Sequence, residues 1–130
     1  MLSAIIKKTY DADKMKKTNV VMWGNGTARR EFLYISDLVD FLFLCSKKIN
    51  KIPNVINVGY GKDFTVKKLY ELVLKQINPK LKIAKNTKMP VGQKYKLMNI
   101  NKAIKIGWRP KITINKGIEL TIKFLEKNSY

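Results

Sequence analysis

The stretch from Ser36 to Lys48 constrains the fold of this chain more than any other part of the sequence. Apolar side chains follow one another here in close succession: Leu38, Val39, Phe41, Leu42, Phe43, Leu44 and Cys45. Because serine is a good N-cap, Ser36 predicts a helix that runs to about Lys48. Apolar side chains would cover nearly its whole circumference, and such a helix is normally buried on several sides. A chain of 130 residues has difficulty covering it alone, so we expect a partner surface.

The rest of the chain alternates between strand-like and helix-like apolar patterns. Strands are predicted at residues 19–23, 30–35, 55–58 and 81–84, and helices at 2–10, 65–78, about 99–107 and about 115–125. The Asn25-Gly26 dipeptide between the first two strands predicts a β-hairpin. Asn99 or Asn101 is the candidate cap of the third of these helices, and Asn115 that of the last. The alternation indicates an α/β fold.

Composition excludes several classes of protein. The longest apolar run is residues 41–45, which is far shorter than the ~20 residues that a membrane-spanning helix needs. The first residues lack the basic-then-apolar order of a secretory signal. One cysteine and no histidine exclude a disulfide framework, a zinc cluster and any catalysis that depends on histidine. We therefore expect a cytoplasmic protein with no membrane partner and no metal site.

The formal charge of +18 is suited to binding a polyanion, but the types of basic residue argue against nucleic acid as the partner. Arginine occurs only at positions 29, 30 and 109, so lysine supplies nearly all of the 27 cations. Arginine is the residue whose planar fork best recognises phosphates and base edges. The composition is therefore more typical of a lysine-rich background than of a nucleic-acid site. A basic polyanion-binding module stays open as an alternative, because charge alone produces non-specific attraction.

Gly59 and Gly61 stand between a predicted strand and a predicted helix, where a dinucleotide-binding fingerprint would begin. The third glycine of that fingerprint should fall at position 64, which is Phe64. The acidic residue expected about 20 residues after the first glycine is also missing, since positions 79–88 hold neither Asp nor Glu. An ordinary glycine turn is the better interpretation, and no residue is assigned to a cofactor.

Residues 23–32, with the sequence WGNGTARREF, form the most specific stretch of the chain. Trp23 ends a predicted strand, and Arg29 and Arg30 follow it across a tight turn. An aromatic face can stack on a nucleobase and a guanidinium can clamp a diphosphate. The alternative is structural: a core tryptophan, an Arg–Glu surface pair and an ordinary hairpin. Residue types alone do not decide between the two interpretations.

Several segments together resemble the GDP-L-fucose synthases, a branch of the NAD-dependent epimerase/dehydratase family within the extended short-chain dehydrogenases/reductases. The similarity is carried in order by residues 21–27 (VMWGNGT), 30–38 (REFLYISDL), 56–61 (INVGYG), 96–99 (KLMN) and 107–110 (GWRP). It covers essentially the whole chain. The motif at 56–61 is shared across the superfamily, whereas the segment around Trp23 and Arg30 narrows the match to this branch and close sugar-nucleotide relatives.

The resemblance implies a fold and an activity. It implies that the chain corresponds to the C-terminal substrate-binding portion of an α/β enzyme, an extended short-chain dehydrogenase/reductase. Residues 1–130 would then form a single segment, which holds the last strand and helix of an otherwise missing Rossmann domain. The family binds NADP and GDP-4-keto-6-deoxymannose, epimerises the sugar at C3 and C5, and reduces the C4 ketone. Epimerisation needs an acid and a base beside carbons that the ketone makes acidic.

In that family the glycine-rich loop, the Tyr-x-x-x-Lys pair and the catalytic Ser, Cys and His precede the segment seen here. We therefore assign no catalytic residue, expect no NADP to bind this chain alone, and expect a truncated chain to be inactive alone. The expected partners are a GDP-sugar, and a polypeptide with the Rossmann half or a second copy; nucleic acid is not expected. A fragment of a divergent NAD-dependent sugar-nucleotide epimerase/dehydratase is the nearest alternative.

The resemblance also assigns substrate-binding residues. Trp23 would pack against the guanine and ribose, and Arg30 would contact the diphosphate. Lys8 stands where the family usually has Arg, and Lys96 matches a lysine on the diphosphate side; a solvated surface residue is the alternative for each. Val91 stands where the family has an Asp that binds the nucleotide sugar, which points to a divergent nucleotide specificity.

Overall fold

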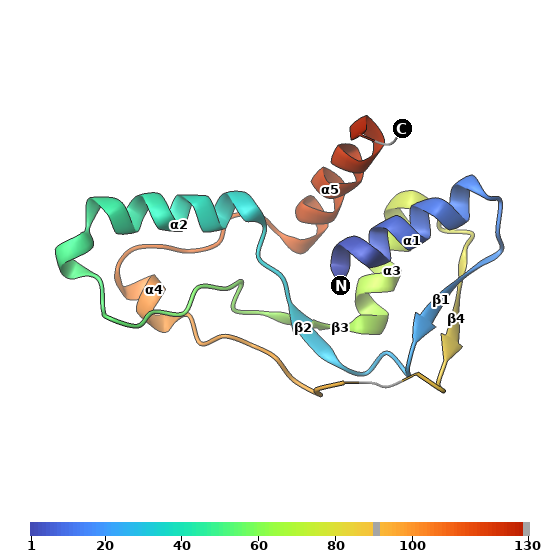
Figure 1. The fold of residues 1–130 in the computed structure, drawn as a ribbon, viewed down its shortest axis with the longest axis horizontal. Coiled ribbons are helices and arrows are strands. Elements are labelled where there is room, and N and C mark those ends of the chain that lie inside the picture. The colour runs from blue at the N-terminus through green and yellow to red at the C-terminus, as the bar shows by residue number, and fades with distance from the viewer. Residues whose placement is uncertain (90–91, 129–130) are drawn as a thin grey trace.

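The computed structural model describes residues 1–89 and 92–128 and shows an elongated molecule with two parts (Figure 1). The larger part holds helices α1 (Leu2–Lys14), α3 (Val66–Ile77) and α5 (Ile114–Asn128) and strands β1 (Asn19–Trp23) and β4 (Lys82–Asn86). The smaller part holds α2 (Ile35–Lys47), the short 3-10 helix η1 (Ile49–Lys51) and α4 (Asn101–Lys105). Strands β2 (Arg29–Glu31) and β3 (Asp63–Thr65) lie between them.

The core of the larger part lies between the three helices and a two-stranded parallel sheet. β1 pairs with β4 from Asn19 opposite Lys82 to Trp23 opposite Asn86. Along β1 the even positions, Val20 and Met22, are buried, because successive side chains of a strand point to opposite faces. The helices add the other buried side chains, among them Ile5, Ile6, Leu69, Val73 and Ile118. The predicted alternation of strands and helices is thus confirmed for this part.

The predicted β-hairpin around Asn25-Gly26 is wrong. β1 pairs with β4, whereas β2 forms a separate antiparallel pair with β3. The turn instead redirects the chain from one sheet to the other, with Gly24 and Gly26 at φ of 71° and 78°. A side chain at Gly26 would meet Met22, because a Cβ there would lie 2.8 Å from the Met22 Sδ. The Asn-Gly signal therefore located the turn but not its strand partners.

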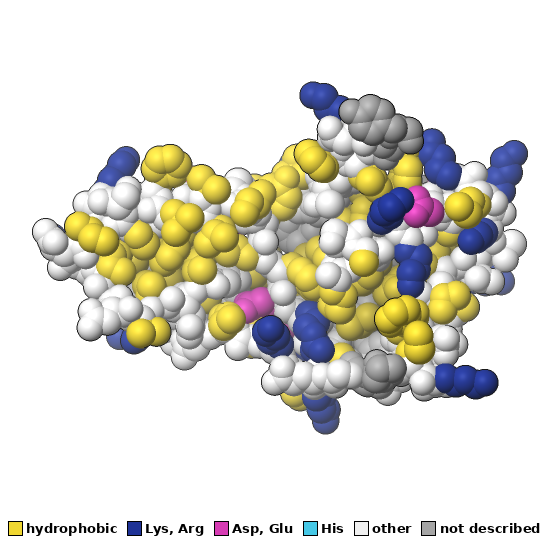
Figure 2. All heavy atoms as spheres, viewed as in Figure 1, with side chains coloured by type: hydrophobic (Ala, Val, Ile, Leu, Met, Phe, Trp, Pro, Cys, Tyr) yellow, Lys and Arg dark blue, Asp and Glu magenta, His cyan; other side chains and the backbone are white. Residues whose placement is uncertain are grey.

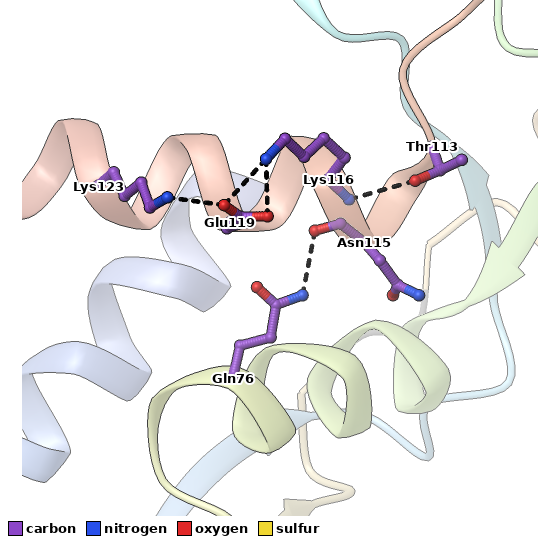
Figure 3. Close-up of polar contacts among 6 residues, drawn as sticks. All are labelled: Gln76, Thr113, Asn115, Lys116, Glu119 and Lys123. Atoms are coloured by element: carbon purple, nitrogen blue, oxygen red, sulfur yellow. Dashed lines mark hydrogen bonds and ion pairs between the residues drawn. The ribbon is translucent and has the colours of Figure 1, made fainter.

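Two predicted helix caps lie one or two residues from the observed helix starts. α2 begins at Ile35, before Ser36, and has no side-chain cap. α5 begins at Ile114, so Asn115 lies inside the helix, and the Thr113 Oγ1 accepts a hydrogen bond from the Lys116 backbone N–H (Figure 3). At α4 the prediction is closer, because the Asn99 Oδ1 accepts from the Asn101 N–H.

Residues 55–58, predicted as a strand, are irregular. No strand is assigned there in the described structure, and Val55 is 71% exposed. Strand geometry is maintained by a hydrogen-bonded neighbour, and among the described residues none pairs with this segment. The apolar sequence is suited to a sheet that the described part of this chain does not provide.

α2 forms as predicted, but it is buried on one side only. Phe41 packs edge-on against Trp108 with ring centroids 5.3 Å apart, in a small core that also contains Ala103. The opposite face stays open, and its large side chains are 41–64% exposed: Ile35, Val39, Leu42 and Phe43. Figure 2 shows the resulting hydrophobic surface over the part of the molecule that holds α2. Among the described helices, none has the length and apolar character needed to cross a bilayer.

Candidate functional site

A cavity of about 430 Å³ opens between α1, the ends of β1 and β2, and the start of α3. This volume falls within the range typical of small-ligand sites, about 300–1,000 Å³. Three of the four predicted site residues line it, namely Lys8, Trp23 and Arg30. The rest of the lining is mostly apolar: Met1, Ala4, Ile5, Ala28, Val66 and Tyr70. The structure therefore brings together, in one concave site, residues that come from three separate elements.

Trp23 is positioned by the strand that it ends. Met22, its neighbour, points into the core and is fully buried, so Trp23 must point to the other face, where it is 58% exposed. The interpretation of Trp23 as a core residue is therefore wrong. A large exposed indole at the edge of a cavity can stack on a flat apolar ligand group.

Lys8 is held beside this indole. Its Nζ donates a hydrogen bond of 3.1 Å to the Val21 carbonyl and lies 5.3 Å from the centre of the Trp23 ring. The Tyr70 hydroxyl donates to the same carbonyl at 3.3 Å. Burial raises the pKa of Tyr70, so this hydroxyl stays protonated and can act as a donor. The sequence analysis placed Tyr70 only within the helix predicted at 65–78, where its spacing from the other apolar residues fits one helix face, and its place in the cavity was missed.

Arg29 and Arg30 have different roles, although they are adjacent. Arg29 forms a two-point ion pair with Asp63 on β3, with its Nε and Nη2 2.9 Å and 2.7 Å from the two carboxylate oxygens. The hydrogen bond with Arg29 lowers the pKa of Asp63, and the same bond raises the pKa of Arg29. Because side chains alternate along a strand, Arg30 faces the other way and lines the cavity. Its guanidinium bonds to the Arg29 carbonyl at 2.6 Å.

Lys96 is not brought into the cavity lining. It is exposed and lies on an extended segment that passes β2, where the Arg29 N–H donates to the Lys94 carbonyl at 2.9 Å. The same segment approaches Arg30, because a Cβ built on Gly92 would be 3.7 Å from an Arg30 guanidinium nitrogen. The prediction about Val91 lies outside the described residues.

The turn at Gly59 and Gly61 does not fit a dinucleotide. The Gly61 N–H, which a pyrophosphate would need, donates instead to the Glu31 carboxylate at 2.9 Å. A Cβ at Gly61 would lie 2.7 Å from the Ile100 Cδ1, so a side chain packs where a ligand would approach. β3 also separates the turn from α3, so no helix begins at the turn itself. The interpretation as a structural turn is favoured over an NADP site.

The chain is similar in sequence to proteins named as GDP-sugar synthases. Residues 1–59 match the family described as the NAD dependent epimerase/dehydratase family. The chain is 37% identical over 131 residues to a GDP-L-colitose synthase from Yersinia pseudotuberculosis, covering 99% of the chain and 42% of that protein. It is 35% identical to a GDP-L-fucose synthase from Azorhizobium caulinodans, covering 95% of the chain and 40% of that protein.

The fold agrees with these sequence matches. A solved GDP-mannoheptose C4 reductase from Campylobacter jejuni, with NADP bound, superposes with a TM-score of 0.79 at 24% identity. The superposition covers 98% of this chain and 44% of that structure. The predicted α/β fold is therefore confirmed, and this chain shares it with part of the solved reductase. The chain spans about two fifths of the length of the curated relatives that it matches.

Proposed function

We propose that the chain belongs to the NAD-dependent epimerase/dehydratase family, whose model matches residues 1–59, and that its cavity binds the nucleoside diphosphate part of a GDP-linked sugar during nucleotide-sugar biosynthesis. The observation that carries this proposal is the meeting of Lys8, Trp23 and Arg30 around one cavity. The proposed reaction is that of the GDP-L-fucose synthases: epimerisation of a GDP-4-keto-6-deoxy sugar followed by reduction of its ketone.

The three side chains suit the chemistry of a nucleoside diphosphate. The exposed indole of Trp23 offers a flat apolar surface for the base and ribose. Arg30 supplies a planar fork that can donate two hydrogen bonds to one phosphate group. Lys8 adds a point charge at the same end of β1, held there by the Val21 carbonyl. Two cations beside one aromatic face balance the charge of a diphosphate ester.

We assign the redox chemistry to a further α/β part that holds NADP. The turn at Gly59 does not fit that cofactor, and the open face of α2 is an apolar surface suited to a covering sheet. Residues 1–130 then form a substrate-binding segment, with Lys96 as a further cation near the diphosphate. A second copy of the chain is the other candidate to cover this face.

One observation favours a second candidate function, the binding of a polyanion. Another cavity, of about 660 Å³, lies at the opposite end of β1, and four lysines line it: Lys16, Lys17, Lys80 and Lys82. The described lining contains no aromatic side chain, so nothing there can stack on a base. Polyanion binding predicts an affinity for duplex DNA that falls steeply with salt, with a log–log slope of about −0.9 for each phosphate contacted.

Isothermal titration of the pure chain with GDP tests the proposal at physiological salt. We expect saturable binding that Arg30→Ala weakens by about tenfold or more, because a hydrogen bond to a charged group contributes about 1.5–3 kcal/mol. Arg109→Ala is the matched control, since Arg109 is an exposed arginine away from the cavity lining. Absence of GDP binding, or equal affinities for the wild-type chain and Arg30→Ala, would refute the proposal. Tighter binding of a DNA duplex than of GDP would favour the second candidate.

A further inference from the structure

Glu31, directly after Arg30, joins three segments that are far apart in the sequence. One oxygen of its carboxylate, Oε1, accepts the Met98 N–H at 2.8 Å. The other, Oε2, accepts the Gly61 N–H at 2.9 Å. Both oxygens are therefore engaged with backbone donors rather than with a cation. The interpretation of residues 23–32 as containing an Arg–Glu surface pair is wrong on this point.

The surroundings show that this junction is tightly packed. A Cβ at Gly59 would lie 2.9 Å from a Glu31 carboxylate oxygen, so glycine is the residue that allows the carboxylate to approach. A Cβ at Gly61 would meet Ile100, two residues after Met98. Glu31 is itself half-buried. The turn at 59–61, the segment at 98–100 and β2 thus contact one another at a single point.

Strand geometry connects this junction to the cavity. Side chains alternate along β2, so Arg29 and Glu31 share one face and Arg30 takes the other. Arg29 holds the 92–98 segment through its backbone N–H, which donates to the Lys94 carbonyl, and Glu31 holds it through its carboxylate, which accepts the Met98 N–H. Lys96 lies between these two anchors, while Arg30 faces the cavity.

From this arrangement we infer that Glu31 is a positioning residue of the substrate site, which fixes the strand bearing Arg30 against the segment bearing Lys96. The inference rests on the proposed function, since the two cations would share the diphosphate of the nucleotide sugar. A carboxylate is required because each of its two oxygens accepts a hydrogen bond from a different backbone N–H group. An amide has one acceptor oxygen, so a glutamine must release either Gly61 or Met98.

The test compares affinities for GDP and GMP, which differ by the second phosphate. We expect Glu31→Gln to lower the affinity for GDP by about tenfold, which is roughly the effect of one lost charge-assisted hydrogen bond. The affinity for GMP should fall by no more than about threefold. Met98→Pro removes one of these two hydrogen bonds from its donor side and should reproduce this pattern. The double variant should lose little more than either single one, because without the Met98 N–H the glutamine oxygen can keep the Gly61 N–H and only one hydrogen bond is lost. Glu119→Gln, on α5, makes the same charge change away from the cavity and is the control.

The outcomes separate this inference from the function on which it rests. If the wild-type chain binds GDP and Arg30→Ala weakens it, but folded Glu31→Gln binds both nucleotides as the wild type does, the positioning role is refuted and the proposed function stands. Equal losses for GDP and GMP would also refute it, because general loosening of the structure has no preference for the second phosphate. If Glu31→Gln does not fold, the affinities of Met98→Pro for GDP and GMP decide whether Glu31 has the positioning role. Absence of GDP binding by the wild-type chain would overturn both the positioning role of Glu31 and the proposed function.

Discussion

Replacement of Asp37 by alanine should destabilise the attachment of α2 to the rest of the molecule. Asp37 lies in the first turn of α2 and is only 2% exposed. Its two carboxylate oxygens accept the backbone N–H groups of Lys111 and Ile112, at 3.1 Å and 3.0 Å, in the segment that leads into α5. A methyl group in place of the carboxylate leaves both donors without an acceptor.

The expected loss follows from the cost of an unsatisfied donor. A buried N–H that loses its partner costs about 1–3 kcal/mol, and two partly buried donors bring the estimate to about 2–4 kcal/mol. Asp37→Asn keeps one acceptor oxygen, so it should lose about half as much. The hydrogen bond from the Trp108 indole goes to the Asp37 backbone carbonyl and survives in both variants. A typical domain has only about 5–15 kcal/mol of total stability, so the effect is large.

Urea unfolding followed by tryptophan fluorescence measures this loss, since Trp108 is buried beside α2. Asp40→Ala is the control: Asp40 lies one turn further along α2 and holds the exposed Lys111 Nζ at 2.8 Å. Exposed ion pairs contribute little to stability, so this variant should unfold close to the wild type. If Asp37→Ala and Asp40→Ala unfold at the same urea concentration, the Asp37 carboxylate does not hold α2 to the segment before α5.

Two other predictions concern the larger part and the strand pair beside it. Arg29 lowers the pKa of Asp63 below its ordinary 3.8, so the stability from this pair should be present above that pH and lost as the pH falls through the lowered value. Thermal unfolding from neutral to acidic pH should show this loss in the wild type and less of it in Asp63→Asn; equal pH profiles would contradict it. Lys16 has φ of 53° after the end of α1, so Lys16→Gly should raise the unfolding free energy by about 0.5–1 kcal/mol. A lower urea midpoint for that variant would contradict this expectation.

Local patterns predicted the elements, whereas the pairing of strands depended on distant packing. The period of the apolar residues located α1, α3 and β1 to within a few residues. The sequence around Asn25 could not show that β1 pairs with a strand about 60 residues away, because that choice is made by the helices that cover the sheet. The strand predicted at 55–58 failed for a related reason: strand geometry needs a neighbour, and the described chain offers none there.

In the candidate site, too, local patterns were easier to predict from the sequence than contacts between distant segments. Trp23 and Arg30 belong to one local motif, so the sequence alone could place them together. Tyr70 was missed because its spacing fits an apolar helix face equally well. Glu31 was missed because its partners are backbone N–H groups, which leave no signature in side-chain identity. Sequence patterns thus identified three residues that line the cavity, but not the residues that hold them in place.

The charge of the chain becomes informative only when each cation is seen with its neighbours. Lys7 and Lys8 are adjacent and chemically identical, yet Lys7 pairs with Asp11 on the exposed side of α1, as Lys116 and Lys123 pair with Glu119 on α5 (Figure 3). Lys8 instead turns towards the Val21 carbonyl and the Trp23 ring. The difference arises because successive residues of a helix are about 100° apart. The net charge of +18 therefore says little about function, whereas a cation held against an exposed indole at a cavity does.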